Sequence, residues 1–268
     1  MLQHLSGATA DLHERSAQAL AGLGSSAPAA RSAFVMEPVD RALVLGSSQP
    51  AGIADAKACA REGVRIVRRR SGGGVVLVEP GGQLWVDLLV PAGDALWEPD
   101  VGRAAWWVGE AWARALASVG LSGAAVWKGA FARRPGGDLS CFATLGAGEV
   151  TWSPEERPAP GGAVATLDSV DPALASSFGR TKLVGIAQRR TKFGTLFQCS
   201  CLLRWEPERL VSLLRLSARE RRTAVRDLAG VATGVPAEPS ELLSALMGSL
   251  PAGASRPRAG TCGTGLDV

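Results

Sequence analysis

Residues 68–74 combine three arginines, one serine and three glycines between two predicted strands. Consecutive glycines expose backbone N–H groups and allow a ligand to approach the main chain closely. The adjacent arginines add fixed positive charge, which suits a carboxylate or a phosphate. A basic β-turn without a ligand explains the same residues. The segment is not a Walker-type nucleotide loop, because no Gly-Lys-Ser/Thr sequence follows it.

A lysine and a glycine share the strand predicted at residues 182–188. Alternation along a strand predicts that Lys182, Val184 and Ile186 lie on one face. Gly185 in mid-strand weakens a sheet and often marks the close approach of a ligand. Lys182 is therefore a candidate for polarising a carbonyl group or holding a phosphate. The alternative, which spacing alone favours, is a strand-end lysine that reaches solvent.

Cys141 is a candidate nucleophile, because a thiol becomes reactive beside a cation or a helix end. The two histidines, His4 and His13, lie near the N-terminus, which argues against a histidine-based triad or a metal site. Lys182 would then have to supply the electrostatic help. The alternative is that Cys141 is a small buried packing residue.

The cysteine count favours a reducing compartment. Five cysteines in 268 residues are an odd number in a large chain, which argues against a secreted disulfide framework and favours the cytoplasm. Cys199 and Cys201 lie two residues apart in an apolar run. We expect them on one face of a strand, as packing residues and not nucleophiles.

The elements that must position these residues follow from hydrophobic periodicity. Strands are predicted within residues 33–46 (two, broken at 37–38) and at 64–67, 75–78, 84–90, 141–145, 149–152, 182–188 and 194–203. Helices are predicted at residues 8–23, 53–62 and 103–119 and through the region after 203. A hairpin turn at residues 80–82 is expected to join two of the strands. Strands followed by helices predict an α+β fold with a largely antiparallel sheet.

Residues 1–250 are expected to form a single domain, followed by a flexible tail at 251–268. The proline-rich segment 153–180 has no clear period, which predicts a mobile insertion in a hairpin. A net charge of +4 is too mild to argue for nucleic acid as a partner. No long uncharged stretch predicts a membrane helix, and no secretory signal is expected.

Together these motifs resemble the lipoate–protein ligase family. Arg-Arg-x-Ser-Gly-Gly-Gly followed by two strands looks like that family's first signature, and Lys-x-x-Gly-x-Ala-Gln-Arg-Arg from residue 182 is similar to its second. Residues 42–49 resemble the strand that opens the family's substrate pocket. The likeness spans residues 33–203. Two long motifs in the right order are far more specific than either alone.

The resemblance implies a mixed sheet flanked by helices, as in the class II synthetase-like catalytic domain shared with biotin–protein ligases. It also implies attachment of a lipoyl or octanoyl group to a lysine of a lipoyl domain, in 2-oxoacid dehydrogenases or the glycine cleavage H protein. Lys182 would contact the acyl carbonyl or the phosphate of an acyl adenylate. Strands 75–78 and 84–90 would wall the acyl tunnel. The residues expected to bind the acyl group or nucleotide are Arg69, Ser71, Gly72, Gly73, Gly74 and Gly185.

The family divides by mechanism, and the resemblance leaves both mechanisms open. Ligases activate free lipoate or octanoate with ATP and Mg²⁺, whereas octanoyltransferases need no such cofactor and pass the acyl group through a cysteine thioester. The first expectation is a ligase-type enzyme. The alternative is an octanoyltransferase with Cys141 as the nucleophile and an acyl carrier protein as the donor.

Two departures from the family pattern lie near the expected pocket. Many members have a His-Asp or similar pair after the glycines, where this chain has Val78 and Glu79. Many have a His-Gly pair on the last strand, where this chain has Gln198 and Cys199. These changes leave open a third possibility, a non-catalytic acyl-binding or regulatory member.

Overall fold

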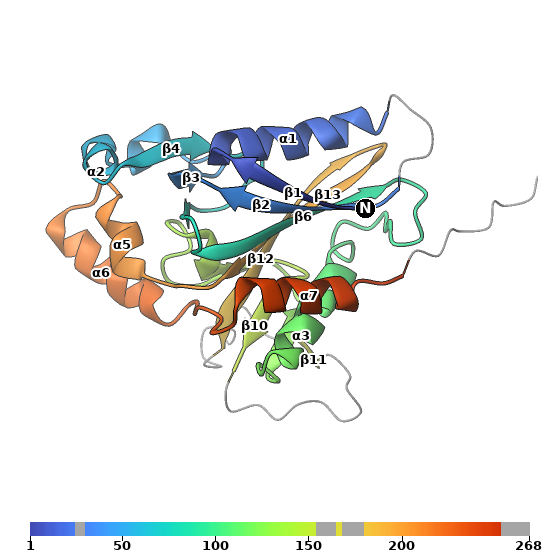
Figure 1. The fold of residues 1–268 in the computed structure, drawn as a ribbon. Coiled ribbons are helices and arrows are strands. Elements are labelled where there is room, and N and C mark those ends of the chain that lie inside the picture. Colours follow the sequence, from blue (N-terminus) through green and yellow to red (C-terminus); the bar gives the residue numbers. More distant parts are fainter. Residues whose placement is uncertain (25–29, 154–164, 168–179, 253–268) are drawn as a thin grey trace, which may run out of the picture.

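An eight-stranded mixed sheet forms the centre of the structure, a computed structural model that describes residues 1–24, 30–153, 165–167 and 180–252 (Figure 1). In order across this sheet the strands are β1 (Leu2–Gly7), β2 (Ser32–Pro38), β6 (Gln83–Pro91), β13 (Gly194–Leu202), β12 (Thr181–Thr191), β10 (Val150–Trp152), β7 (Ala124–Trp127) and β11 (Ala165–Leu167). The β1–β2 and β7–β11 pairs are parallel, and the others are antiparallel. The prediction of an α+β fold with a mixed, largely antiparallel sheet is confirmed.

The last strand of the chain, β13, lies in the middle of the sheet between β6 and β12. A second sheet has the order β4 (Val64–Arg68), β3 (Arg41–Leu45) and β5 (Val76–Val78). A short antiparallel pair consists of β8 (Ala132–Arg133) and β9 (Thr144–Leu145), and in the sequence these two strands flank the turn that carries Cys141.

Helices cover both faces of the large sheet (Figure 1). On one face, α1 (Thr9–Gly22) packs Leu12 and Leu20 against side chains of β2, β6 and β13. On the other face, α3 (Trp106–Ser118) and α7 (Pro239–Ser249) pack against a core that includes the fully buried Trp112. Because strand side chains alternate between faces, one strand such as β6 supplies both cores.

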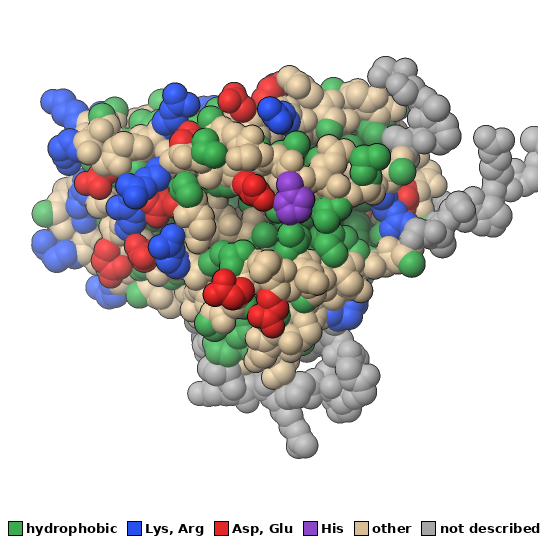
Figure 2. All heavy atoms as spheres, in the orientation of Figure 1, with side chains coloured by type: hydrophobic (Ala, Val, Ile, Leu, Met, Phe, Trp, Pro, Cys, Tyr) green, Lys and Arg blue, Asp and Glu red, His purple; other side chains and the backbone are tan. Residues whose placement is uncertain are grey.

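The remaining helices cover the three-stranded sheet at one end of the molecule, where α2 (Ala56–Arg61), α5 (Pro207–Ser212) and α6 (Ala218–Ala229) share a core with β3 and β5. A capping box fixes the start of α6, since the Ser217 hydroxyl and the Glu220 carboxylate each accept the other residue's backbone N–H. Figure 2 shows Lys and Arg side chains gathered at this end, at the left of the view. On the face shown in Figure 2, the positive charge is therefore concentrated at this end.

The predicted hairpin at residues 80–82 is wrong in its pairing. Both strands exist, but β5 pairs with β3 in the small sheet, while β6 pairs with β2 and β13 in the large one. The segment 80–82 therefore crosses from one sheet to the other. The physical reason is that strand pairing depends on which buried faces pack together. The residues of a local turn do not indicate this.

The strand predicted at residues 141–145 is also partly wrong. Residues Cys141–Ala143 form a single 3-10 turn, η2, and the extended backbone begins at Thr144. Most of the predicted insertion at 153–180 and the tail after 252 lie outside the described residues. None of the helices in the described ranges is long and apolar enough to cross a bilayer.

Candidate active site

A cavity of about 300 Å³ lies between the large sheet, the glycine loop after β4 and the η2 turn. The structure brings six of the eight sequence-predicted site residues to its wall: Arg69, Ser71, Gly72, Gly73, Cys141 and Gly185. The other two, Gly74 and Lys182, lie behind the wall. The structure therefore brings predicted residues from segments that are far apart along the chain to one cavity, and their roles stay predictions.

The glycine loop is a place of close main-chain approach. Gly73 has a φ of +97°, a conformation that L side chains rarely adopt. A methyl group at Gly73 would lie 2.9 Å from Arg69 Nη2 and 3.1 Å from Cys141 Sγ. A methyl group at Gly46, at the end of β3, would collide with the carbonyl oxygen of Gly73. Side chains are therefore excluded from both positions.

Arg69 holds this loop in place from a buried position. Its Nη2 donates to Gly72 O at 2.6 Å and Gly74 O at 2.8 Å, and its Nη1 donates to Val44 O at 3.3 Å. Burial lowers the pKa of the Arg69 guanidinium, and the nearby Cys141 sulfur counters part of that effect. Since Nε also bonds Gly72 O, each nitrogen of Arg69 bonds a backbone oxygen.

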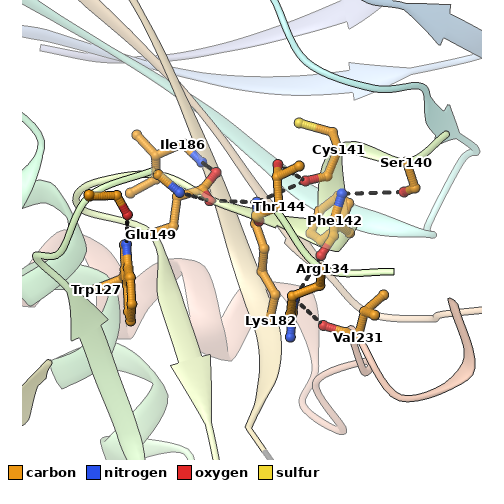
Figure 3. A network of polar contacts seen from close by, with 12 residues as sticks. Trp127, Arg134, Ser140, Cys141, Phe142, Thr144, Glu149, Lys182, Ile186 and Val231 are labelled. Atoms are coloured by element: carbon orange, nitrogen blue, oxygen red, sulfur yellow. Dashed lines mark hydrogen bonds and ion pairs between the residues drawn. The ribbon is translucent and has the colours of Figure 1, made fainter. Parts of the chain in front are cut away.

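Cys141 stands at the start of η2 (Figure 3) and is one of the residues that line the cavity. The Ser140 hydroxyl caps this turn by accepting a hydrogen bond from Phe142 N at 3.2 Å. The sequence predicted Lys182 as the cation that helps the thiol. The structure instead places Arg69 Nη2 and Cys141 Sγ close together, at 2.9 Å and 3.1 Å from the position that a Cβ atom would occupy at Gly73.

Lys182 is fully buried, so the alternative of a lysine that reaches solvent is wrong. Its Nζ donates to the Glu149 carboxylate at 2.6 Å, to Thr144 O at 2.9 Å and to Cys141 O at 3.1 Å (Figure 3). Glu149 in turn accepts from the backbone N–H of Ile186 at 3.1 Å. Lys182 therefore fixes the backbone of the turn that carries the thiol.

The predicted placement of Lys182, Val184 and Ile186 on one face is right for Val184 and Ile186, which pack against the same core, and wrong for Lys182. The register between β10 and β12 shifts by one residue here, and both Leu183 and Val184 enter the same hydrophobic core. The shift brings the Lys182 side chain beside Gly185, where an added methyl group would lie 3.5 Å from Lys182 Cε.

His13 reaches the cavity from α1, although its place near the N-terminus gave no sign of this. Its ring lies 4.5 Å from that of Trp85, and its Nδ1 is 3.4 Å from Gln198 Nε2. Burial, and secondarily Arg69, lower the pKa of His13 to about 4, so the ring is neutral at pH 7. Glu149 was missed as well, because only the fold pairs it with Lys182.

A family model matches residues 23–237 of the chain, and its description is the lipoyl protein ligase A/B catalytic domain. The chain belongs to this family. The model match covers the glycine loop, the η2 turn and the Lys182 strand, so it includes all the residues predicted from the two signatures. A comparison with curated protein sequences finds no match.

Solved structures show that the lipoyl protein ligase fold extends over nearly the whole chain. A bipartite lipoate protein ligase from Thermoplasma acidophilum has a TM-score of 0.63 at 17% identity, over 92% of this chain and 80% of that one. A lipoate-protein ligase A bound with ATP has a TM-score of 0.61 at 17% identity, over 92% and 82%. LipL1 of P. falciparum, in complex with lipoate, has a TM-score of 0.59 at 12% identity, over 93% and 60%.

The cavity wall follows the prediction at β5 but differs from it at β6. Val76 and Val78 line it, as expected for the strand at 75–78. On β6, however, Leu84, Val86 and Leu88 pack into the opposite core, and the cavity meets Gln83 and Trp85 instead. The predicted apolar wall from residues 84–90 is therefore right for Trp85 and wrong for Leu84, Val86 and Leu88, because alternation turns these aliphatic side chains away.

Proposed function

We propose that this protein transfers a lipoyl or octanoyl-type acyl group to a lysine of a lipoyl-domain protein, with Cys141 as the carrier. The observation that carries the proposal is the position of Cys141 Sγ, at the wall of the cavity and beside the glycine loop. Family membership supports the acyl group and the lysine acceptor. A lipoyl domain is the expected acceptor because the Thermoplasma acidophilum structure is described together with its E2 lipoyl domain.

The reaction has two acyl transfers. In the first, the Cys141 thiolate attacks the thioester carbonyl of an acyl carrier protein donor, and the donor thiolate leaves and takes up a proton. In the second, the neutral amine of the acceptor lysine attacks the Cys141 thioester, forms the amide, loses a proton and releases the cysteine. Bond energies of thioester and amide favour this direction, so no ATP is required.

The contacts of the two predicted phosphate ligands favour the thioester route over an acyl adenylate. Arg69 uses its nitrogens on backbone oxygens, and Lys182 donates to Glu149 and two carbonyls. Glu149 itself lines the cavity, and its ion pair with Lys182 keeps this lysine from binding a phosphate there. These residues do not fit ATP and Mg²⁺ in the arrangement described, so we derive no step through them.

Mass spectrometry of a purified lipoyl domain tests the proposal directly. One reaction holds octanoyl-acyl carrier protein without ATP, and the other holds free lipoate with Mg-ATP. We expect acylation in the first reaction, loss of it in Cys141→Ala, and full activity in the control Cys201→Ala, whose sulfur is buried in the core. Acylation only in the second reaction, retained in Cys141→Ala, would identify a ligase. Binding of donor without transfer would indicate a non-catalytic member.

A further inference from the structure

The floor of the cavity is a polar patch of the large sheet. Register places Trp85, Ser200 and Gly185 side by side on β6, β13 and β12. The next row along the same face joins Asp87 to Gln198, whose side chains lie 3.4 Å apart. Gln83, Gln198 and Ser200 all line the cavity, whereas the residues between them pack into the opposite core.

Two polar groups on this floor have no hydrogen-bond partner in the described part of the chain. The Gln83 side chain is only 8% exposed, and its Nε2 makes no hydrogen bond. Ser200 Oγ is also unpaired, and so is Ser71 Oγ in the glycine loop. An unsatisfied buried donor costs about 1–3 kcal/mol. A cavity shaped only for a hydrocarbon chain would leave these groups unpaired with substrate bound.

The buried Asp87 carboxylate on the floor disfavours an anionic substituent beside it. Asp87 is fully buried, accepts hydrogen bonds from Ser16, Trp85 and Gln198, and has its pKa raised by burial to about 6. A second carboxylate near it would raise that pKa further. Glu149 also lines the wall, where its charge is paired with Lys182. The unpaired donors therefore fit a neutral oxygen.

We propose that the acyl chain taken by this site carries a neutral hydrogen-bond acceptor, such as a hydroxyl or carbonyl oxygen, which Gln83 Nε2 and the Ser200 hydroxyl bind. The inference rests on the proposed function, because it names the substrate class of the same site. It departs from the lipoyl or octanoyl chain that the resemblance implies. A bare octanoyl chain would leave both donors unsatisfied.

Binding of free acids tests this inference independently of Cys141 chemistry. We would titrate the Cys141→Ala protein calorimetrically with octanoate and with a series of octanoates that carry one hydroxyl group at successive carbons. One hydroxylated acid should bind about tenfold more tightly than octanoate, since one satisfied buried hydrogen bond is of that size. Octanoate binding as tightly as every member of the series would overturn the inference.

Variants test whether the preference for a hydroxylated acid depends on the floor residues or on the general polarity of the cavity. Gln83→Met and Ser200→Ala should each reduce the preference for the hydroxylated acid, and either variant alone suffices if the other does not fold. Thr195→Val is the matched control, because Thr195 lies on the same strand with an unpaired hydroxyl but outside the cavity wall. An unchanged preference in both floor variants, or an equal loss in Thr195→Val, would contradict the assignment.

The wild-type protein is then incubated with the matching thioesters. Selective binding without acylation of Cys141 would refute the proposed function and leave the substrate class standing. Acylation of Cys141 at equal rates by all donors, together with equal binding of all acids, would support the proposed function and refute the proposed substrate class.

Discussion

At the scale of single residues, the buried ion pair of Lys182 and Glu149 links stability to the position of the nucleophile. The two side chains are 0% and 7% exposed, so each charge depends on the other. Lys182 also binds the carbonyl oxygens of Cys141 and Thr144, at both ends of η2. Removing the lysine should therefore affect the fold and the site together.

We expect Lys182→Met to lower the free energy of unfolding by about 3–5 kcal/mol, because it leaves the Glu149 carboxylate buried and unpaired. Acyl transfer should be lost as the η2 turn moves. Urea unfolding at pH 7 measures the first effect. The double variant Lys182→Met, Glu149→Gln is the control and should recover part of the stability, since no buried charge remains. A single-variant loss below about 1 kcal/mol would mean that the pair is solvated.

His13 predicts a pH dependence of stability. Its folded-state pKa of about 4 lies below the ordinary 6.5, so its contribution to stability is present above pH 6.5 and is lost as pH falls through 4. The loss should reach about 3 kcal/mol. Asp87, with its raised pKa, acts in the opposite direction between about pH 4 and 6.

The measurement that isolates His13 is urea unfolding of the wild type and His13→Phe across this pH range. The advantage of the wild type over the variant should shrink on acidification. A difference that does not change with pH would show that His13 keeps its ordinary pKa in the folded state.

The sequence predicted residues whose neighbours along the chain form a motif, and it missed those that only the fold brings in. Arg69, Gly73 and Cys141 were predicted as site residues, and all three line the cavity. His13 and Glu149 were not predicted, because their partners Gln198 and Lys182 are distant in sequence. Whether each residue acts in catalysis stays a prediction.

At the scale of elements, the glycine loop after β4 depends on a second glycine at the end of β3. Gly46→Ala places a methyl group against the Gly73 carbonyl, and neither backbone segment can move freely within its sheet. We expect a loss of about 1–3 kcal/mol in unfolding free energy, as for other overpacked sites. The Cys141 thiol should also change its rate of alkylation by iodoacetamide.

Gly52→Ala is the control for Gly46→Ala, since a methyl group there meets nothing within 4 Å. It should leave both stability and alkylation rate at their wild-type values. Normal stability and alkylation in Gly46→Ala would show that the loop tolerates displacement from β3.

Elements were predicted better than their pairing. The helices 8–23 and 103–119 and the strands 182–188 and 194–203 correspond to α1, α3, β12 and β13. Periodicity within a segment is local, so sequence reports it well. The passage of the chain from one sheet to the other at residues 80–82 and the register shift at Leu183 depend on distant strands. No local pattern predicts them.

At the scale of the whole molecule, protection from solvent should be greatest where the sheet is covered on both faces. Strands β6, β13 and β12 are paired on both sides and lie under helices, whereas β1 is an edge strand with alternating exposed residues. Hydrogen exchange followed by mass spectrometry should show β6 and β13 exchanging last and β1 early. Comparable exchange in β1 and β13 would indicate that a further chain covers this edge.

The central place of the last strand has a consequence for how the protein is made. A ribosome completes β6 and most of β12 before β13, which lies between them, has left the exit tunnel. Until then both strands present open edges, the state in which a nascent chain is most prone to aggregate and to need a chaperone. The floor that receives the acyl chain also includes Gln198 and Ser200 of β13. The cavity is therefore complete only after β13 has been made, and a chain that stops before residue 198 lacks part of the floor.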